Sequence, residues 1–507
     1  MTNFVFILYF VLMLGIGIYF YLKDKKNSEA GDKAYFLGGR KMGAWVTAMS
    51  AQASDMSAWL LMGLPGSILA FGLGQVWIAV GLALGTAANW FLVARRLRQF
   101  SEAAADSITL PQYLTNRFAK KSHGLSIICA IVFLVSFTIY VASSFVAGAA
   151  VFGTILPELD SNWAMAIFAT ILICYTFLGG FSAVSWTDLV QGSLMLIAVV
   201  SIPIILVANG ALNASLLETT TYNGVELSPF VTSLTSAPWS EIVSGLGWGL
   251  GYFGMPHIIV RFMAIREPSM VRKSTIIALV WLAIALSSVA LIAYFARMTP
   301  WGLELVAGGE QKLVFVKAAS LYFPPFLGGI LLSAVIAASM STADSQLLVA
   351  SSAFTTDIYK PLFRKDASPK EIQWMGRAIV LAVAVVAYII ASSKSNGAQA
   401  IMNMVENAWG LFGAAFGAVI LLSLFWKRFT YTGAIAGIST GAIVDIAWLL
   451  LFNNGADSLI CQTGVYEIIP GFFCAMAAGV IVSLLSDKPS AEVEEIFAKA
   501  TAEEVRA

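Results

Sequence analysis

The chain has 507 residues, of which 59% are hydrophobic and 12% are charged, and its formal net charge is +1 at pH 7. This composition excludes an ordinary soluble domain and indicates an all-α polytopic membrane protein. The charge balance gives no basic excess for nucleic acid, so the expected surroundings are a lipid bilayer. A disulfide framework or a cysteine metal site is not expected, because three of the four cysteines lie in apolar stretches: Cys129, Cys174 and Cys474, with Cys461 in a loop.

Windows of about 20 apolar residues, the length that crosses the hydrocarbon core, recur along the whole chain. They predict about thirteen transmembrane helices. The first window follows only Met-Thr-Asn and has no small-residue cleavage site after it, so we expect it to remain as a helix. The approximate ranges are 3–22, 44–68, 75–95, 125–153, 163–182, 189–209, 241–262, 274–296, 325–346, 376–393, 402–425, 432–452 and 468–486.

Lysine and arginine are concentrated in alternate loops. Those loops contain 26 of the 30 positive residues, including Arg261 at the start of the loop 261–273. Positively charged loops are retained on the cytoplasmic side of a membrane. We therefore expect a plasma (inner) membrane protein with its N-terminus outside and its C-terminus in the cytoplasm, where residues 490–507 form a short polar helix.

The second window carries a carboxylate inside its apolar run. Asp55 lies between Ser54 and Ser57, and a glycine, a proline and a second glycine follow at 63, 65 and 66. A charged side chain within a membrane helix is costly and marks a functional site by default. We predict that the helix breaks here and that its freed carbonyls become ligands for a cation. The alternative is a packed helix in which Asp55 bonds to a neighbour.

A second break is predicted within residues 244–257, where five glycines precede Pro256. Trp248, Tyr252 and Phe253 stand between the glycines and are suited to wall a small pocket. A helix-packing interface would explain the same pattern. We interpret His257 as a hydrogen-bonded structural histidine.

The ninth window ends in a polar cluster. The adjacent hydroxyls of Ser341 and Thr342 are hard oxygen ligands, and Asp344 and Ser345 follow about one turn later. Hydroxyls in membrane helices also bond their own backbone, which is the alternative. Neutral oxygens of this kind suit a weakly polarising alkali cation.

The positions of the two breaks indicate an inverted repeat, in which discontinuous helices occupy corresponding places in two halves. An odd number of five spans per half inverts the second half. We divide the chain into a peripheral first helix and loop, the first repeat, an extracellular loop, the second repeat, two peripheral helices and a cytoplasmic tail: 1–43, 44–209, 210–240, 241–425, 426–486 and 487–507.

Several stretches carry a resemblance that covers about two-thirds of the chain. They are Tyr35–Arg40, Ala53–Gly66, Phe137–Tyr140, Tyr175–Phe181, Ala183–Asp188, Gly247–Gly254 with Pro256 and His257, and Met340–Gln346. In these stretches the chain resembles the sodium:solute symporter family, and within it the members that carry proline. The resemblance implies a LeuT-type fold with a 5+5 inverted repeat, whose first helix is broken in each repeat.

The resemblance also implies a sodium site that joins two of the clusters. Its ligands would be the carbonyls of Ala53, Met56 and Ala338 and the hydroxyls of Ser341 and Thr342. All five ligands are neutral, so the nearby Asp55 would favour the cation electrostatically.

Two further sets of residues follow from the resemblance. Proline would lie beside the breaks, packed by aromatic side chains: Trp59, Tyr140, Trp248 and Tyr252. A second sodium would use Asp188 with Ser345 and Asp344, although a structural role for Asp188 is an equal alternative.

The expected function is sodium-coupled uptake of a small solute, most of all proline, by alternating access, with Na⁺ as the coupling ion and no cofactor. Symport of a sugar, sialic acid or a carboxylate is the main alternative. A channel is disfavoured because the polar residues cluster at a few breaks instead of lining a pore. An enzyme is disfavoured because His123, His257 and scattered acids form no catalytic set.

Overall fold

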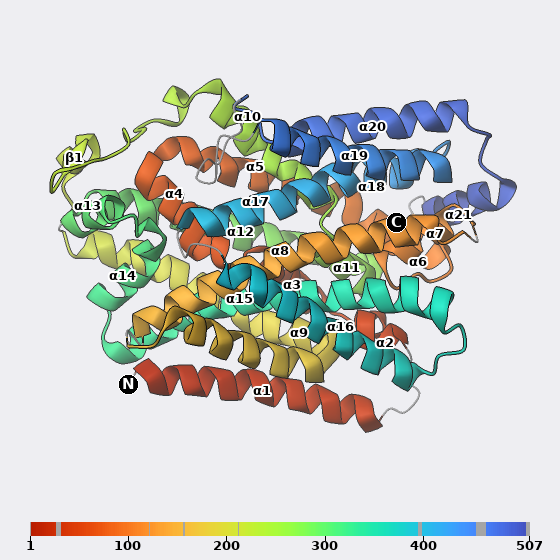
Figure 1. Cartoon of the computed structure of the whole chain (residues 1–507), viewed down its shortest axis with the longest axis horizontal. Coiled ribbons are helices and arrows are strands. Elements are labelled where there is room, and N and C mark those ends of the chain that lie inside the picture. Colours follow the sequence, from red (N-terminus) through yellow and green to blue (C-terminus); the bar gives the residue numbers. More distant parts are fainter. Residues whose placement is uncertain are drawn as a thin grey trace.

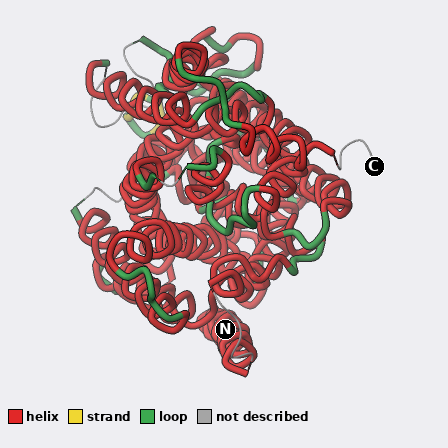
Figure 2. Tube along the Cα trace, turned by 90° about the vertical axis from the view of Figure 1, so that its right-hand side faces the viewer, coloured by secondary structure: helices red, strands yellow, loops and turns green. Residues whose placement is uncertain are grey.

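The protein is a bundle of helices that run along the long axis of the molecule (Figure 1). This computed structural model describes residues 2–26, 32–120, 122–155, 158–210, 212–393, 398–452 and 463–502. Within these ranges ten helical stretches are long and apolar enough to cross a membrane, as expected for a multi-pass protein. Figure 2 views most of the bundle end on.

These ten stretches coincide with ten of the predicted windows. Apolar segments form helices because inside a bilayer each backbone group must find its partner within its own segment. The helices in the stretches are α1 (Thr2–Lys26), α5 (Val76–Ala88), η4 (Asn89–Ala94), α6 (Arg95–Ala103), α8 (Gly124–Ile155), α9 (Ser161–Ala208), α12 (Val271–Arg297), α15 (Pro325–Phe354), η10 (Thr355–Phe363), α16 (Pro369–Ser392), α17 (Ala398–Phe412), η11 (Gly413–Gly417), α18 (Ala418–Phe425), α19 (Tyr431–Leu451) and α20 (Ile468–Leu485).

The other three windows lie over interrupted or shorter helices. Windows 44–68 and 241–262 contain the two breaks, and window 163–182 covers the first part of α9. Gly180 divides α9 in two, with φ 58° and ψ −170°, a conformation that residues with a Cβ rarely adopt. A Cβ there would also lie 2.9 Å from the Tyr35 ring.

The centre of the bundle is formed by α15, which packs against α9, α8, α1 and α3 (Ala44–Asp55). In its membrane window 83% of the residues are buried, against 33% for α1 at the periphery. The polar cluster of the ninth window therefore lies in the interior of the protein. Cys129 is buried, Cys174 and Cys474 are exposed, and all three are free thiols, whereas Cys461 lies outside the described residues.

One end of the bundle, which we call the α21 end, carries α2 (Asp32–Leu37), η1 (Gly38–Arg40), α7 (Leu110–Arg117), η8 (Pro268–Met270) and α21 (Ala491–Ala502). α21 is the predicted polar helix of the tail. Arg40 is buried here and donates to Asp106 at 2.8 Å, and Lys33 pairs with the same carboxylate. Partial burial raises the pKa of Asp106, but the hydrogen bond from Lys33 and the charge of Arg40 together hold that pKa below its ordinary value.

The opposite end, the β1 end, carries η3 (Leu73–Gln75), η5 (Ala214–Glu218), β1 (Thr221–Tyr222), β2 (Val225–Glu226), η6 (Leu234–Ser236), α13 (Pro300–Ala307), η9 (Gln311–Leu313) and α14 (Val314–Tyr322). β1 and β2 form an antiparallel hairpin, in which Thr221 pairs with Glu226. Its turn residues, Asn223 and Gly224, both have positive φ, as two-residue hairpin turns require.

Candidate cation and substrate site

The first of the two predicted breaks falls at Met56. α3 (Ala44–Asp55) ends there, and η2 (Trp59–Gly63) and α4 (Leu64–Phe71) continue the segment. Met56 has φ −84° and ψ 70°, and the Ser57 amide donates to the Asp55 carbonyl at 3.0 Å, two residues back. The Ala53 carbonyl, four residues before Ser57, thereby loses its helical donor.

This freed carbonyl faces α15. Ser341 Oγ donates to the Ala53 carbonyl at 2.7 Å and to the Ala338 carbonyl at 3.2 Å, and Thr342 Oγ1 also donates to Ala338 at 3.2 Å. All four residues are buried, as is Met56 at the break. The structure thus gathers neutral oxygen atoms from two segments 288 residues apart. Hydroxyl groups can turn a lone pair toward a cation, so this set fits an alkali ion bound by carbonyls and hydroxyls.

Asp55 connects the two breaks directly. Its Oδ2 accepts a 2.6 Å hydrogen bond from the hydroxyl of Tyr252, 197 residues along the chain. The side chain is 5% exposed, and within the described part of the chain it forms no ion pair. A buried carboxylate without a cationic partner is costly, so its charge favours a cation at the break. The bond to Tyr252 was not predicted from the sequence.

The second break separates α10 (Trp239–Gly247) and η7 (Trp248–Phe253) from α11 (Pro256–Ala264). Glycine is required within it because neighbours approach closely: a Cβ on Gly251 would lie 1.9 Å from Trp409 Nε1. That indole nitrogen donates to the Trp248 carbonyl at 2.8 Å. His257 Nε2 lies 3.1 Å from the Ser54 carbonyl, so the histidine is hydrogen-bonded, as predicted, and joins α11 to the first break.

Aromatic side chains from both breaks meet in the interior. The rings of Trp59 and Trp248 are 5.8 Å apart, and the ring of Tyr466 lies 5.3 Å from that of Trp248. Tyr140 is also buried, and its ring lies 6.3 Å from His257. The indole Nε1 of Trp59 is buried and has no hydrogen-bond partner among the described residues, which leaves a donor for a polar group of a ligand.

Two aromatic neighbours of this group were not found from the sequence. Trp409 lies 5.0 Å from Tyr252, ring to ring, and Tyr466 donates its hydroxyl to the Glu406 carbonyl at 2.7 Å. Both residues belong to late segments without a glycine-rich break. Their local sequence therefore carried no signal for a pocket.

The three residues predicted for a second sodium also lie together, around a cation of the protein itself. Arg261 contacts Asp188 Oδ2 at 3.3 Å and donates to Ser345, whose hydroxyl donates to Asp344 at 3.2 Å. Asp188 also accepts from Ser50 at 2.6 Å. Placing Arg261 in a loop was wrong: it is a residue of α11, it is 2% exposed, and it packs among carboxylates.

The cluster holds two carboxyl groups and one guanidinium group. Asp188 and Asp344 are both fully buried, and Arg261 contacts Asp188 directly and Asp344 through Ser345. The second oxygen of Asp188, Oδ1, has no hydrogen-bond partner in the described structure. A buried carboxylate oxygen without a partner is an acceptor that a cation can contact. Tyr175 donates to Asp344 at 2.5 Å, a contact that the sequence did not indicate.

A backbone bridge links the broken segments at the α21 end. Met42, just before α3, pairs with Ile265, just after α11. The Met42 amide donates to the Ala264 carbonyl at 3.3 Å, and the Arg266 amide donates to the Met42 carbonyl at 2.9 Å.

The β1 end has a bridge with the same pattern. Val231, which precedes α10, pairs with Gly72, which follows α4. The Val231 amide donates to Phe71 at 3.1 Å, and the Leu73 amide donates to Val231 at 2.7 Å. The two bridges share one pattern. Met42 bonds to the residues on either side of Ile265, and Val231 bonds to the residues on either side of Gly72.

Interrupted membrane helices with buried oxygen atoms gathered at an interruption define the class of the protein: a membrane transporter. The sequence pattern of the family described as "Sodium:solute symporter family" matches residues 35–441. The chain therefore belongs to the sodium:solute symporter family, which confirms the resemblance.

Several curated relatives are named "Sodium/proline symporter". The one from Haemophilus influenzae is 41% identical over 504 residues, 99% of this chain and 97% of its own length. The one from Escherichia coli is 44% identical over 473 residues, 92% of this chain and 91% of its own length. A relative from Bacillus subtilis, "High-affinity proline transporter PutP", is 42% identical and covers 96% of this chain and 98% of its own length.

Solved structures share the fold. A Na⁺-coupled sialic acid symporter in a substrate-bound outward-open state superimposes with a TM-score of 0.71 at 18% identity, over 96% of this chain and 98% of its own. Mhp1, a nucleobase-cation-symport-1 family transporter, in a closed conformation, gives a TM-score of 0.56 at 14% identity over 92% and 98%. At these identities the likeness concerns the fold alone.

Proposed function

We propose that this chain takes up proline by symport with sodium. The observation that carries the proposal is the contact of the freed Ala53 carbonyl with Ser341, which joins a broken helix to a hydroxyl pair on α15. The names of three relatives at 41 to 44% identity over nearly the whole chain supply the substrate.

The proposed sodium site consists of the carbonyls of Ala53, Met56 and Ala338 and the hydroxyls of Ser341 and Thr342. Each ligand is neutral, so the attraction for the cation comes from Asp55 beside it. The absence of an ion pair to Asp55 within the described residues supports this role.

The proposed substrate pocket lies between the two breaks. Trp59, Trp248, Tyr252 and Tyr140 offer apolar faces to the proline ring, and the partnerless Nε1 of Trp59 is a donor for the carboxylate. Because Tyr252 bonds to Asp55, a change in the charge balance at the cation site acts directly on a residue of the substrate pocket. This contact gives sodium and proline a route for reciprocal coupling.

A second sodium is proposed at Asp188, Asp344 and Ser345. The partnerless Oδ1 of Asp188 supports it. The opposite reading, in which Arg261 is the permanent counterion and the cluster is structural, rests on the Arg261–Asp188 ion pair. The sodium stoichiometry of transport decides between them.

We further propose thirteen transmembrane helices in a LeuT-type arrangement, with inverted repeats at 44–209 and 241–425. The equal hydrogen-bond pattern of the two bridges supports the inverted relation, because Met42 and Val231 precede corresponding helices while Ile265 and Gly72 follow them. Outside the repeats, segments 1–43 and 426–486 are peripheral, 210–240 is the extracellular loop and 487–507 is the tail.

Positive residues support a cytoplasmic location for the α21 end in the plasma membrane, with the N-terminus outside. Alternating access then requires the bridge at Met42 and the bridge at Gly72 to open in turn, each releasing one end of both broken helices. Sodium entering from outside carries a charge inward, which the membrane potential favours by roughly 2.3 kcal/mol per 100 mV.

Uptake of labelled proline into proteoliposomes tests the function. A sodium gradient should drive accumulation above equilibrium, potassium should not replace sodium, and unlabelled proline should compete. Sodium-driven accumulation of a labelled sugar, sialic acid or carboxylate, without accumulation of labelled proline, would assign the alternative substrate. A proline flux that does not saturate with concentration, and that is not stimulated by unlabelled proline on the other side of the membrane, would indicate a channel.

A further inference from the structure

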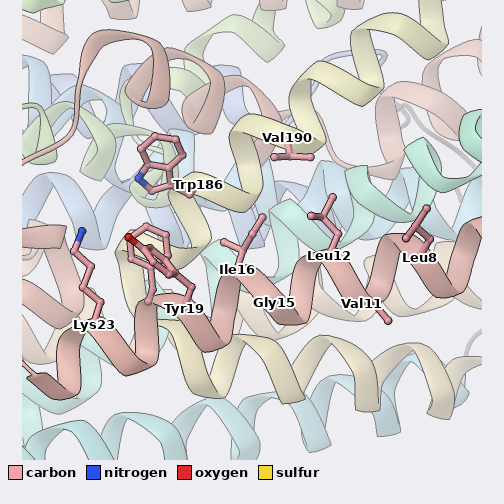
Figure 3. A pocket seen from close by; sticks show the side chains of 10 residues that line it. Leu8, Val11, Leu12, Gly15, Ile16, Tyr19, Lys23, Trp186 and Val190 are labelled. Atoms are coloured by element: carbon pink, nitrogen blue, oxygen red, sulfur yellow. The ribbon is translucent and has the colours of Figure 1, made fainter.

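An apolar groove runs along the outer face of α1, and none of the residues of the proposed transport site lines it. It has a volume of about 710 Å³ and is lined mainly by α1, with Trp186 and Val190 of α9 on its other side (Figure 3). From Leu8 to Lys23 it extends for about 22 Å at the rise of an α-helix. This length exceeds half of the ~30 Å hydrocarbon core, so one acyl chain of a single leaflet fits within it.

The groove is apolar along its length and polar at one end. Leu8, Val11 and Leu12 are exposed by about half of their surface and line the apolar part. Gly15 lies at its middle, where a Cβ would meet nothing within 4 Å, so the glycine widens the groove. Two thirds of the membrane window of α1 is not buried by protein, as a surface in contact with lipid requires.

The polar end brings three donors together. Lys23, Tyr19 and Trp186 lie at the same end of the groove (Figure 3), and the Lys23 ammonium is 5.9 Å from the Tyr19 ring. Within the described residues Lys23 forms no ion pair. Lys23 is also the last residue of the apolar stretch Phe4–Lys23, so its long side chain can reach the headgroup region of a bilayer.

We infer that this groove binds one anionic phospholipid of the leaflet at the α21 end. Its acyl chain lies along Leu8, Val11 and Leu12 past Gly15, and its phosphate accepts from Lys23, with Tyr19 and Trp186 as further donors. A lysine attracts an anionic headgroup more than a zwitterionic one, so the site prefers an anionic lipid. The inference rests on the proposed topology only for naming this leaflet cytoplasmic.

The test is lipid binding to the purified, delipidated full chain in detergent, measured by native mass spectrometry and by the shift in melting temperature. The probes are phosphatidylglycerol and phosphatidylcholine with identical acyl chains. Wild type should bind phosphatidylglycerol more tightly. Lys23→Gln should weaken phosphatidylglycerol binding about fivefold and leave phosphatidylcholine unchanged, as expected for one lysine at an anionic surface.

Two control pairs separate the groove from general effects. Gly15→Leu fills the groove and should lower binding of both lipids, whereas Gly153→Leu, at a helical glycine of α8 with equally open surroundings, should not. Lys41→Gln, at an exposed lysine outside the groove, should keep the preference. Equal binding of the two lipids by wild type, a preference that survives Lys23→Gln, or a Gly15-dependent dimer in place of lipid would overturn the inference. Binding needs no transport, so failure of the proline assay leaves this test intact.

Discussion

The replacement Gly72→Ala tests whether the bridge at the β1 end closes the outer side during transport. Gly72 has φ 94° and ψ −163°, a region nearly restricted to glycine, and a Cβ there would lie 2.4 Å from the backbone N and O of Val231. Backbone atoms cannot rotate away as a flexible side chain can. The variant must therefore separate the two backbone segments that form the bridge.

The expected size follows from what the bridge loses. Its two hydrogen bonds contribute about 0.5–1.5 kcal/mol each, and alanine in this backbone region costs about 1–3 kcal/mol. A combined penalty of about 2–6 kcal/mol on the outer-closed state shifts the equilibrium toward the outer-open state by roughly 30- to 25,000-fold. Uptake must pass through the outer-closed state, so its rate should fall at least ~30-fold.

The assay compares sodium-driven proline uptake with sodium-dependent proline binding in the same preparation. Binding should persist in Gly72→Ala, because the variant populates the state open to outside proline and sodium, and its persistence separates a transport defect from misfolding. Gly224→Ala is the matched control, since Gly224 has φ 80° but nothing within 4 Å of its Cβ position. Uptake by Gly72→Ala equal to that by Gly224→Ala would refute a gating role for the bridge.

Three further predictions concern single contacts. Ser341→Ala should raise the sodium concentration for half-maximal proline uptake about tenfold. Ser339→Ala should match wild type, because among the described residues the Ser339 hydroxyl bonds only within its own helix. Tyr252→Phe removes the hydrogen bond to Asp55, worth about 1.5–3 kcal/mol to a charged group, and titration should show proline and sodium affinities that no longer depend on each other. Neighbouring cations lower the pKa of Asp106, so the ionised carboxylate stabilises the fold above its unfolded pKa of 3.8, and this stabilisation is lost as pH falls through the folded pKa. The melting temperature of Asp106→Asn should therefore be lower than that of wild type at pH 6 and converge with it below pH 3.8. A difference in melting temperature that stays constant with pH would contradict this.

The breaks were predictable from sequence because each disturbs an apolar run locally. Asp55 and Pro256, with the glycines around them, are conspicuous within windows that are otherwise apolar. The pairing of hydroxyls on α15 with the first break came only from the family resemblance, because Ala53 and Ser341 are 288 residues apart and carry no mutual signal.

What sequence reasoning missed lies at the ends of windows or in unremarkable helices. Arg261 lies at the end of an apolar window, where a positive residue is typical of the start of a loop. Its partner Asp188 is 73 residues away in the sequence. Trp409 and Tyr466 lie in apolar or loop segments where an aromatic residue predicts nothing specific. Burial of a charge depends on the fold of the whole chain, and a window of one segment cannot contain that information.

The two proposed cation sites share the same pair of helical turns. On α3, Ser50 donates to Asp188, and three residues later the Ala53 carbonyl accepts from Ser341. On α15, Ser345 follows Ser341 by four residues and accepts from Arg261. A cation that changes the bonds of either hydroxyl therefore acts on one face shared by α3 and α15. Because linkage between binding sites is reciprocal, any effect of the Arg261 cluster on sodium affinity at the proposed first site equals the effect of that sodium on the cluster. We therefore expect the buried arginine to contribute to coupling whether or not a second sodium binds beside it.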